Sequence, residues 1–573
     1  MKETIRTQLL VIGGGGAGLF AAIKARDAGV EDVTLVTKGK LGYDSIATFA
    51  AGVLDVVFPD DDKDEEFKRR TLDENWGAGL SDEDWLTLRL EEGYQRFMDL
   101  INWGIEFKRG NGGFLRYPMK RGAKKVMFHG YVLAEKMAEQ VRARKVRVVE
   151  HTMVTDFLIA GPDGGKQVTG AIGFDVKTGE TRVFEAKGVV VANGGCGYRG
   201  RFAAHWMDTG DGVAAALRAG AVLGRFDQLA FHTTAAHFDI QGLNMFQGLG
   251  GRWVNASGEE FMKDYDPELG NRAGMTRLSQ ACAMEVRAGK GPIFLDMTHF
   301  SSEQVRLLKW TLPTATRLLE KAGVIVGDRI VRKIEWAPVF YGTIVSGGGI
   351  ETNTNCETSV SGLFAAGDAR ARARNFRSLV GAFVSGARAG SSAAEFVKKF
   401  GRTWVTPDPE QVKEASNSFQ ALLDRRDGIP PSHILARLQE ILLPYEVSII
   451  QHRERLERAL KKLESLKKDL AFVYAADPHS MRVAYEVKNM VAIAELQLRS
   501  LLLRTESRDA CLREDFPYTD NREWLKWIKV KREGDSLKFW TENITYKRLR
   551  PEEKRYLHPV FQAAKKKGIW KEH

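Results

Sequence analysis

Short apolar runs predict the buried strands of an α/β fold. Residues 9–12 form the first run, and residues 19–28 follow it with apolar positions at helical spacing. A second apolar run, 33–36, comes directly after this helix, as expected for the second parallel strand of a strand–helix–strand unit. Two further runs, 189–195 and 363–368, begin apolar and end in two glycines or in a glycine and an acid. The chain is therefore predicted to contain a parallel sheet whose strands end in glycine-rich turns.

Other segments have a different periodicity. Residues 147–175 and 181–191 alternate in the manner of strands, around a turn at 162–165, whereas 62–108 is charged and helical in pattern. In the last third of the chain, an apolar stripe at helical spacing predicts a packed helix, and a second helix is expected at about 481–503. The stripe consists of Leu456, Leu460, Leu463, Leu466 and Leu470.

The glycines after the first strand have the spacing Gly13-x-Gly15-x-x-Gly18, the dinucleotide-binding pattern. One glycine allows a tight turn, one lets the backbone approach a pyrophosphate, and one lets the helix pack closely on the strand. The phosphates then lie at the positive end of the helix. Alone this pattern is weak, and its weight here comes from the segments that follow it.

The second strand ends in Thr37 and Lys38, where NAD-type sites have an acid that binds the ribose. Either the glycine pattern is accidental or a hydroxyl group holds the ribose, and Lys38 would add positive charge near the pyrophosphate. Two later glycine–acid pairs also precede helices. Asp211, before a helix expected at 213–219, could bind a ribose hydroxyl or simply cap the helix, and Asp368 could reach a ribityl chain.

Composition narrows the class of protein. A chain of 573 residues that is 43% hydrophobic can bury a large core, and its length suggests two to four domains. No apolar run approaches the roughly 20 residues of a membrane helix, and the first strand begins too early to leave room for a signal peptide, so we expect a cytoplasmic protein. The net charge of +11 favours an anionic substrate, an acidic partner or an anionic membrane face. No nucleic-acid motif accompanies this charge, so we expect no nucleic-acid role.

The four cysteines are widely spaced and contain no C-x-x-C pair. The chain is therefore not expected to hold a zinc ion or an iron–sulfur cluster by itself, and a disulfide framework is not expected either. The cysteines are Cys196, Cys282, Cys356 and Cys511.

Taken together, these segments resemble a known family. The motifs that carry the resemblance are Gly13–Gly18, Thr209–Gly212, Phe231–Thr234, Gly250–Gly251 with Asn255–Met262, Gly347–Ile350, Gly362–Asp368, Gly386–Gly390, Arg504–Arg508 and Arg513–Pro517. They are similar to those of the flavoprotein subunits of the succinate dehydrogenase and fumarate reductase superfamily. That superfamily includes L-aspartate oxidase and the alpha subunit of adenylylsulfate reductase, and the match covers most of the chain.

The resemblance implies an α/β fold with five segments in sequence. A discontinuous Rossmann-like FAD-binding domain would comprise 1–232 and 340–400, with an α+β capping domain, 233–339, inserted into it. A helical domain, 401–510, and a basic, aromatic tail, 511–573, would follow. The resemblance also implies FAD as cofactor. The implied FAD-binding residues are Gly13, Gly15, Gly16, Ala17, Gly18, Thr37, Lys38, Ser45, Gly194, Asp211, Gly367 and Asp368.

Three departures from the family bear on the chemistry. The histidine that often attaches FAD covalently corresponds to Asp44, so we expect non-covalent FAD. The arginine that delivers a proton in fumarate reduction corresponds to Met275, between Arg272 and Arg277, and the family's glutamate falls near Asn244. Because a methionine cannot relay a proton, we do not expect a standard succinate or fumarate enzyme.

The resemblance also implies three catalytic candidates. Arg377 corresponds to the family's substrate-carboxylate arginine and ends a series of arginines that begins at Arg370; the alternative is that this series is a solvated loop edge. His232 matches a histidine of a family motif, and His129 lies in a segment where the family approaches the flavin. No metal site is expected.

The function that follows is an FAD-dependent oxidoreductase. It would exchange two electrons with a small anionic substrate, by hydride transfer at flavin N5 or through an adduct, and would exchange electrons with an iron–sulfur partner. The tail is a candidate docking surface for that ferredoxin-like partner, and peripheral membrane association through a complex stays open.

Three alternatives also stay open: a sulfur-compound reductase like adenylylsulfate reductase alpha, an oxygen-using oxidase, and an electron-transfer subunit with a decayed substrate pocket. The first is weakened because its substrate-side histidine corresponds to Asn375 or Phe376. NAD binding without flavin is disfavoured because the later cofactor segments would then have no purpose.

Overall fold

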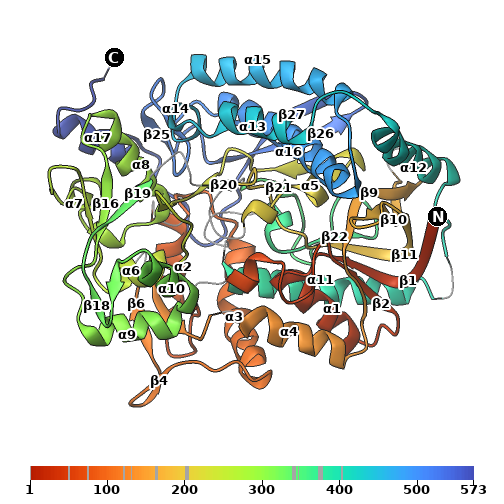
Figure 1. Ribbon diagram of the computed structural model, residues 1–573, viewed down its shortest axis with the longest axis horizontal. Helices are drawn as coiled ribbons and strands as arrows, with labels where there is room; N and C mark the ends of the chain where they lie inside the picture. The colour runs from red at the N-terminus through yellow and green to blue at the C-terminus, as the bar shows by residue number, and fades with distance from the viewer. Residues whose placement is uncertain are drawn as a thin grey trace.

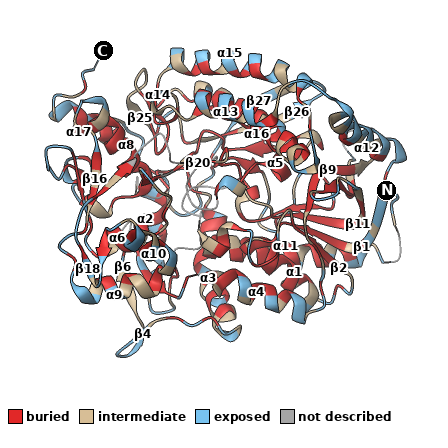
Figure 2. Cartoon of the chain, viewed as in Figure 1, coloured by how far each residue is buried: buried red, intermediate tan, exposed pale blue. Residues whose placement is uncertain are grey.

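The computed structural model places a large sheet and its helices beside a second β-containing region, with the helices of the C-terminal third above both (Figure 1). Figure 2 shows that the large sheet and the helices against it are mostly buried, whereas α15 exposes one face. The described residues are 2–49, 52–73, 77–119, 123–130, 132–161, 165–200, 205–337, 343–345, 347–371, 378–401 and 404–572.

The large sheet has seven strands and a parallel half. Its strands, in spatial order, are β8 (Arg147–Val149), β2 (Val33–Val36), β1 (Lys2–Ile12), β11 (Thr181–Val191), β10 (Gln167–Asp175) and β9 (Thr152–Ala160), with β22 (Leu363–Ala365) also paired to β11. Neighbouring strands among β8, β2, β1, β11 and β22 pair in parallel, whereas β10 pairs antiparallel with both β11 and β9. The predicted strand at 9–12 is only the end of β1, which pairs with β11 over its whole length.

Two helices pack closely against the parallel half of this sheet. Helix α1 (Gly16–Asp27) begins three residues earlier than the 19–28 expected from the apolar spacing, within the glycine motif itself. Helix α11 (Leu379–Lys399) crosses it where glycine leaves no room for a side chain: a Cβ at Gly386 would lie 2.3 Å from the carbonyl oxygen of Ala17. These contacts fix the amino ends of α1 and α11 next to each other.

The remaining helices near this sheet are shorter or more peripheral. The segment 62–108, predicted as helical, contains the two helices α2 (Lys63–Leu72) and α3 (Glu83–Asn102), and residues 77–79 between them form a turn. The other helices are α4 (Val132–Ala143) and α5 (Asp211–Arg218).

A second sheet has the order β14-β19-β16-β15 and lies within the segment expected to form a capping domain, whose boundaries stay a prediction. Its core contains Trp253 and Trp336, whose rings meet edge to face at 5.3 Å. The elements of this region are β13 (Ala230–His232), β14 (Thr234–Ala235), α6 (Leu243–Gly248), β15 (Arg252–Val254), α7 (Met262–Tyr265), α8 (Met275–Arg287), β16 (Ile293–Asp296), α9 (Ser302–Thr311), α10 (Pro313–Lys321), β17 (Ile325–Val326), β18 (Arg329–Ile330), β19 (Ile334–Ala337) and β20 (Thr343–Val345).

The C-terminal third begins with packed helices. Four leucines of the predicted stripe lie on α15, where Leu456, Leu463 and Leu466 are buried, and the fifth, Leu470, follows its last residue. The helix expected at 481–503 is α16. The elements are α12 (Pro409–Asp424), α13 (Pro431–Leu442), α14 (Tyr445–Ser448), β23 (Ile450–Gln451), α15 (Arg453–Asp469), α16 (Pro478–Leu503) and β24 (Leu512–Arg513).

The tail wraps the body of the protein. Strand β26 (Lys526–Glu533) pairs with β27 (Ser536–Asn543) on one side and with β12 (Leu223–Gly224) on the other. The last helix, α17 (Pro559–Lys566), ends beside the second sheet region, where the Lys567 ammonium lies 2.7 Å from Asp264, 3.1 Å from Glu259 and 3.2 Å from Glu285. The other short strands are β3 (Val53–Leu54), β4 (Arg109–Gly110), β5 (Gly113–Phe114), β6 (Arg116–Pro118), β7 (Lys124–Met127), β21 (Gly349–Ile350), β25 (Tyr518–Asp520) and β28 (Arg555–Leu557).

Within the described ranges, we find no helix with both the length and the apolar character needed to cross a bilayer.

Candidate functional site

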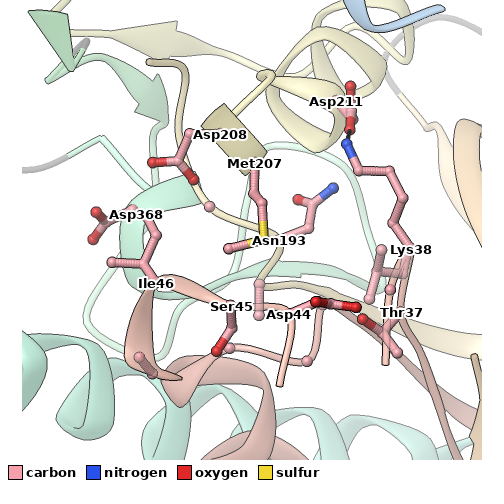
Figure 3. Close-up of a pocket in the computed structure, with 18 of the residues that line it drawn as sticks. Thr37, Lys38, Asp44, Ser45, Ile46, Asn193, Met207, Asp208, Asp211 and Asp368 are labelled. Carbon is pink, nitrogen blue, oxygen red and sulfur yellow. Dashed lines mark hydrogen bonds and ion pairs between the residues drawn. The ribbon is translucent and has the colours of Figure 1, made fainter. Parts of the chain in front are cut away.

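A cavity of about 630 Å³ opens at the carboxyl ends of the parallel strands. The turns after four of the strands line this cavity. Gly13 follows β1 and Thr37 follows β2, whereas Asn193 and Gly367 lie two residues after β11 and β22. This edge is where open parallel sheets bind their ligands. Figure 3 shows these turns converging on one space from separate parts of the chain.

The glycine motif forms the floor of this cavity. Gly13 has φ +116°, and a Cβ there would lie 2.4 Å from the carbonyl oxygen of Ala192. A Cβ at Gly18 would lie 1.9 Å from the carbonyl oxygen of Gly13, so this position lets α1 meet β1 closely. Gly15 begins α1 without a side-chain cap, which leaves the first backbone amides of the helix directed at the cavity.

A second glycine turn closes against the first. Gly367 has φ +62°, and its amide donates to the Ser385 hydroxyl of α11 at 3.0 Å. A Cβ at Gly367 would lie 2.7 Å from that of Ala17. Asp368 and Ser45 also line this part of the cavity.

Every predicted FAD-binding residue except Gly18 lines this one cavity, and Gly18 lies behind it. The sequence prediction therefore located a common site, although the contact that each residue makes with a cofactor stays a prediction.

Lys38 does not leave its charge free for a phosphate. Its ammonium donates to Asp211 at 2.9 Å (Figure 3). It also donates to Thr209 at 2.9 Å and to Glu486 of α16 at 2.7 Å. Burial lowers the Lys38 pKa, but the two carboxylates raise it more, so the net pKa lies above its usual value. The charge of the Lys38 ammonium is thus balanced by ion pairs with the carboxylates of Asp211 and Glu486.

Asp211 is held by protein donors in the same way. Its carboxylate accepts from Lys38, from Thr209 at 2.8 Å and from Asn489 of α16 at 3.0 Å. Burial raises the Asp211 pKa, but Lys38 and these hydrogen bonds lower it more, so the group is ionised at neutral pH. In contrast, the buried Asn193 Oδ1 has no hydrogen-bond partner among the described residues, and Asn193 lines the cavity.

Several lining residues were not predicted, because they reach the cavity only through the tertiary fold. His479 and Arg482 come from the first turns of α16, more than 400 residues from the glycine motif. The others include His151, Lys177, Trp206 and Asp208. Their sequence context carries no motif that could have identified them.

The three catalytic candidates are not brought together by the described structure. His129 is exposed, and its ring meets Trp310 edge to face at 6.0 Å, outside the lining of the cavity. His232 lies in β13 opposite Thr343, and nothing is described of its side chain. Arg377 lies outside the described residues. Their catalytic roles stay predictions.

The arginine series is not a solvated loop edge at its first member. Arg370 is 1% exposed, and its guanidinium lies 3.6 Å from the ring centroid of Trp85 on α3. The loop interpretation of this residue is wrong because stacking on an aromatic ring compensates for the loss of water around the cation.

A buried ionic cluster beside α3 was also missed. Asp55 accepts from both terminal nitrogens of Arg70, at 3.0 and 2.9 Å, and from Arg89 at 2.8 Å. Burial raises the Asp55 pKa, but the two arginines lower it more, to well below its usual value. Burial and the Arg70 charge lower the pKa of Arg89 to about 10, so Arg89 remains a cation at neutral pH.

Arg89 is under-satisfied. Within the described ranges, its Nε and one terminal nitrogen have no hydrogen-bond partner, although the residue is only 3% exposed. Its other terminal nitrogen lies 3.4 Å from the hydroxyl of Ser378, and Ser378 lines the cavity. Buried donors without acceptors are uncommon in native proteins and often mark a site that takes a ligand or an ion.

The two residues predicted to replace the fumarate proton relay are both described in the structure. Met275 is the first residue of α8 and is 5% exposed. The side-chain oxygen of Asn244 accepts from the Lys125 ammonium at 3.0 Å. The two predicted relay positions are therefore occupied by an apolar thioether, that of Met275, and by a neutral amide, that of Asn244.

Comparison with known proteins adds two family matches. A model described as FAD binding domain matches residues 8–384, more than half of the chain. A model described as Fumarate reductase flavoprotein C-term matches residues 436–556.

Relatives along the full chain are similar in sequence and in fold. An uncharacterized FAD-dependent oxidoreductase of Methanocaldococcus jannaschii is 28% identical over 95% of this chain and 98% of its own length. A chain of the fumarate reductase (CoM/CoB) of Methanothermobacter marburgensis is 29% identical over 93% of this chain and 98% of its own. The structure of adenylylsulfate reductase from Archaeoglobus fulgidus superposes with a TM-score of 0.81 at 22% identity, covering 95% of this chain and 97% of that one.

Proposed function

This chain belongs to the fumarate reductase and succinate dehydrogenase flavoprotein superfamily of FAD-dependent oxidoreductases, and on that basis we propose that it exchanges two electrons with a small anionic substrate without the fumarate proton relay. The observation that carries the proposal is the under-satisfied, buried Arg89 next to the wall of the cofactor cavity.

The residues of the cavity fit FAD. The glycine turn brings the backbone to the surface of the cavity, where, among the described residues, only Ser45 comes within 4.0 Å of a Cβ built on Gly15, and the amides at the start of α1 suit the charge of a pyrophosphate. The unpartnered Asn193 oxygen is an acceptor that suits a hydroxyl or an N–H of the cofactor. Bound FAD supplies the two-electron chemistry. We propose that it is held without a covalent bond, since the position predicted to correspond to the attaching histidine is Asp44, and a carboxylate cannot form the histidyl bond. This carboxylate accepts from the backbone amide of Lys40 at 2.7 Å.

The protein would bind the substrate anion through buried cations. Arg70 and Arg89 share the single charge of Asp55, and Arg70 also pairs with Glu66 at 2.7 Å. Of these two cations, Arg89 is the one with donors that have no partner in the part of the chain that the structure describes. A carboxylate or another oxyanion matches the planar fork of a guanidinium, which favours bidentate binding.

Proton transfer must use a group other than the residue at the start of α8. The Met275 thioether carries no exchangeable proton. Standard fumarate chemistry is therefore not proposed, and the proton donor for this substrate is a different residue or water.

An iron–sulfur partner is part of the proposal. It is supported by the relative that is named as one subunit of a fumarate reductase. The four cysteines are buried, and the described residues contain no group of three or more histidine, cysteine or acidic side chains that could hold a metal ion.

The test begins with the chain purified together with whatever copurifies. Yellow colour released by acid precipitation would support non-covalent flavin, and a broad brown absorbance would support an iron–sulfur partner. The chemically reduced protein is then mixed with an unsaturated dicarboxylate, an anionic organic disulfide, a sulfur oxyanion, or oxygen, each of which can accept two electrons. Reoxidation by one of the anions supports the proposal.

The other outcomes count against it. Peroxide production with oxygen alone would indicate an oxidase, and no reoxidation by any acceptor would indicate an electron-transfer role. For an active anion, Arg89→Met should raise KM by about tenfold or more. Arg69→Met is the matched control, because Arg69 pairs with Glu66 at 2.7 Å but not with Asp55. Equal effects of both substitutions would refute a role of Arg89 in binding.

A further inference from the structure

Helix α16 forms part of the wall of the FAD cavity, although it belongs to the C-terminal third. His479 and Arg482, one turn apart on this helix, both line the cavity. The Arg482 guanidinium lies 3.4 Å from the His479 ring nitrogen and 3.4 Å from Glu486. These side chains are placed at the cavity by the fold rather than by any cofactor motif.

Glu486 attaches this helix to the nucleotide-binding sheet. Its carboxylate is 2% exposed and lies 2.7 Å from the Lys38 ammonium and 3.0 Å from the Arg199 guanidinium. Lys38 follows β2, and Arg199 follows the turn after β11. A buried carboxylate shared by these cations holds α16 in a fixed position over the ends of these strands.

The same contacts leave Arg482 with donors to spare. Both oxygens of Glu486 have shorter bonds to Lys38 and Arg199, so the pair with Arg482 is the longest of the three. The Arg482 side chain is 18% exposed, in keeping with its place on the cavity wall.

The order of strands identifies which half of the cofactor lies near Arg482. In such sheets the ribose of the adenosine lies at the end of the second strand, here β2 with Thr37 and Lys38. The segment after β8 stays beside this strand end, because the Thr152 amide donates to the Thr37 carbonyl at 3.0 Å and the Val176 amide donates to the His151 carbonyl at 2.8 Å. His151 to Val154 and Lys177 line the cavity there. Asp368 and the start of α11 lie on the opposite side, after β22. Arg482 lies near the strand end that is expected to face the adenosine ribose, because Glu486 contacts both Arg482 and Lys38.

We propose that Arg482, with His479 beside it, binds the adenosine half of FAD, so that the C-terminal helical region is a component of the cofactor site. A guanidinium suits this place because its planar face stacks on a purine and its edge donates to ribose oxygens. No acid follows β2, and Lys38 is already bound, so α16 supplies polar contacts that the strand end lacks.

The experiment uses the full chain freed of flavin and titrated with FAD and, separately, with FMN, which lacks the adenosine. Arg482→Ala should raise the Kd for FAD by roughly tenfold and leave the Kd for FMN unchanged. ADP should compete with FAD in the unmodified chain and compete less well in the variant. Arg482→Lys keeps the charge but not the planar fork, so its loss of FAD affinity should be intermediate.

Arg499→Ala is the matched control on the same helix. Arg499 is 38% exposed, pairs with Glu495 at 3.0 Å and does not line the cavity. Thermal unfolding of each flavin-free variant checks that the helix has kept its place. The proposal is overturned if Arg482→Ala binds FAD as tightly as Arg499→Ala, or if it loses the same factor of affinity for FAD and FMN. None of these readouts depends on the substrate or the partner.

Discussion

Gly15 and Gly18 belong to one motif, yet the structure predicts opposite consequences of adding a methyl group to each. Gly15 has φ −83° and ψ 179°, a backbone conformation that alanine also adopts. The nearest atom to a Cβ added there is the Cβ of Ser45, at a distance of 4.0 Å. The flavin-free protein therefore has room for Gly15→Ala. A Cβ at Gly18 would instead lie 1.9 Å from the backbone oxygen of Gly13, which cannot move without displacing α1 from β1.

The magnitudes follow from these contacts. Gly15→Ala should leave the flavin-free chain as stable as before or about 0.4–1 kcal/mol more stable, because alanine restricts the unfolded chain. The methyl group would enter the cavity and displace the pyrophosphate from at least one backbone amide, a loss of about 1.5–3 kcal/mol or roughly 10- to 150-fold in Kd for FAD. Gly18→Ala should destabilise the flavin-free chain by about 1–3 kcal/mol through overpacking.

The assay compares urea unfolding of the flavin-free variants with fluorescence titration by FAD. Gly15→Ala should change only the titration, and Gly18→Ala should change the unfolding as well. The reasoning is refuted if Gly15→Ala lowers the unfolding midpoint as much as Gly18→Ala does, or if it binds FAD as tightly as the unmodified chain.

Three further predictions concern groups away from the glycine motif. Asp55→Asn leaves two buried guanidinium groups with one carboxylate fewer and should lower the free energy of unfolding by about 3–5 kcal/mol. Because the Asp55 pKa is depressed, this difference should be complete above about pH 4 and shrink as the pH falls through the folded-state pKa; a difference that persists in strong acid would contradict it. Lys567→Ala removes the ammonium that faces the fully buried Glu285 and should lower stability by about 2 kcal/mol. The Lys567 pKa is raised by its carboxylate partners against the lowering effect of burial, so this loss should be constant up to about pH 10 and vanish at higher pH, as followed by unfolding at stepped alkaline pH; no alkaline convergence would count against the ion pairs. Met275→Leu should keep turnover within about twofold, since the two side chains are similar in volume and neither donates a proton, whereas a hundredfold loss would give Met275 a chemical role.

The parallel strands and the glycine turns could be predicted because their causes are local. Apolar runs of four residues and the glycines that follow them are read directly from the chain, and the cavity lies where they indicated. The first half of β1 was missed because Lys2 to Gln8 is largely polar, and this part becomes a strand by pairing with β11, nearly 180 residues away. No local pattern encodes that partner.

The ionic contacts of the site were less predictable for the same reason. Lys38 was expected to face a phosphate, but Glu486, which binds it, lies 448 residues further along the chain. Arg370 was compared with a solvated loop, but its partner Trp85 is on a helix that is distant in sequence. A residue's charge is visible in a sequence, whereas the group that neutralises it is visible only in the fold.

The long span of the cavity has a consequence for biosynthesis. Its lining runs from Ile12 to Arg482, and β12 receives its partner strand only from 526–533. A ribosome adds about 5–20 residues per second, so the glycine motif emerges well before the wall from α16 exists. The nascent chain therefore carries an incomplete nucleotide pocket until α16 has been synthesised, and flavin loading becomes a step that follows the emergence of this helix.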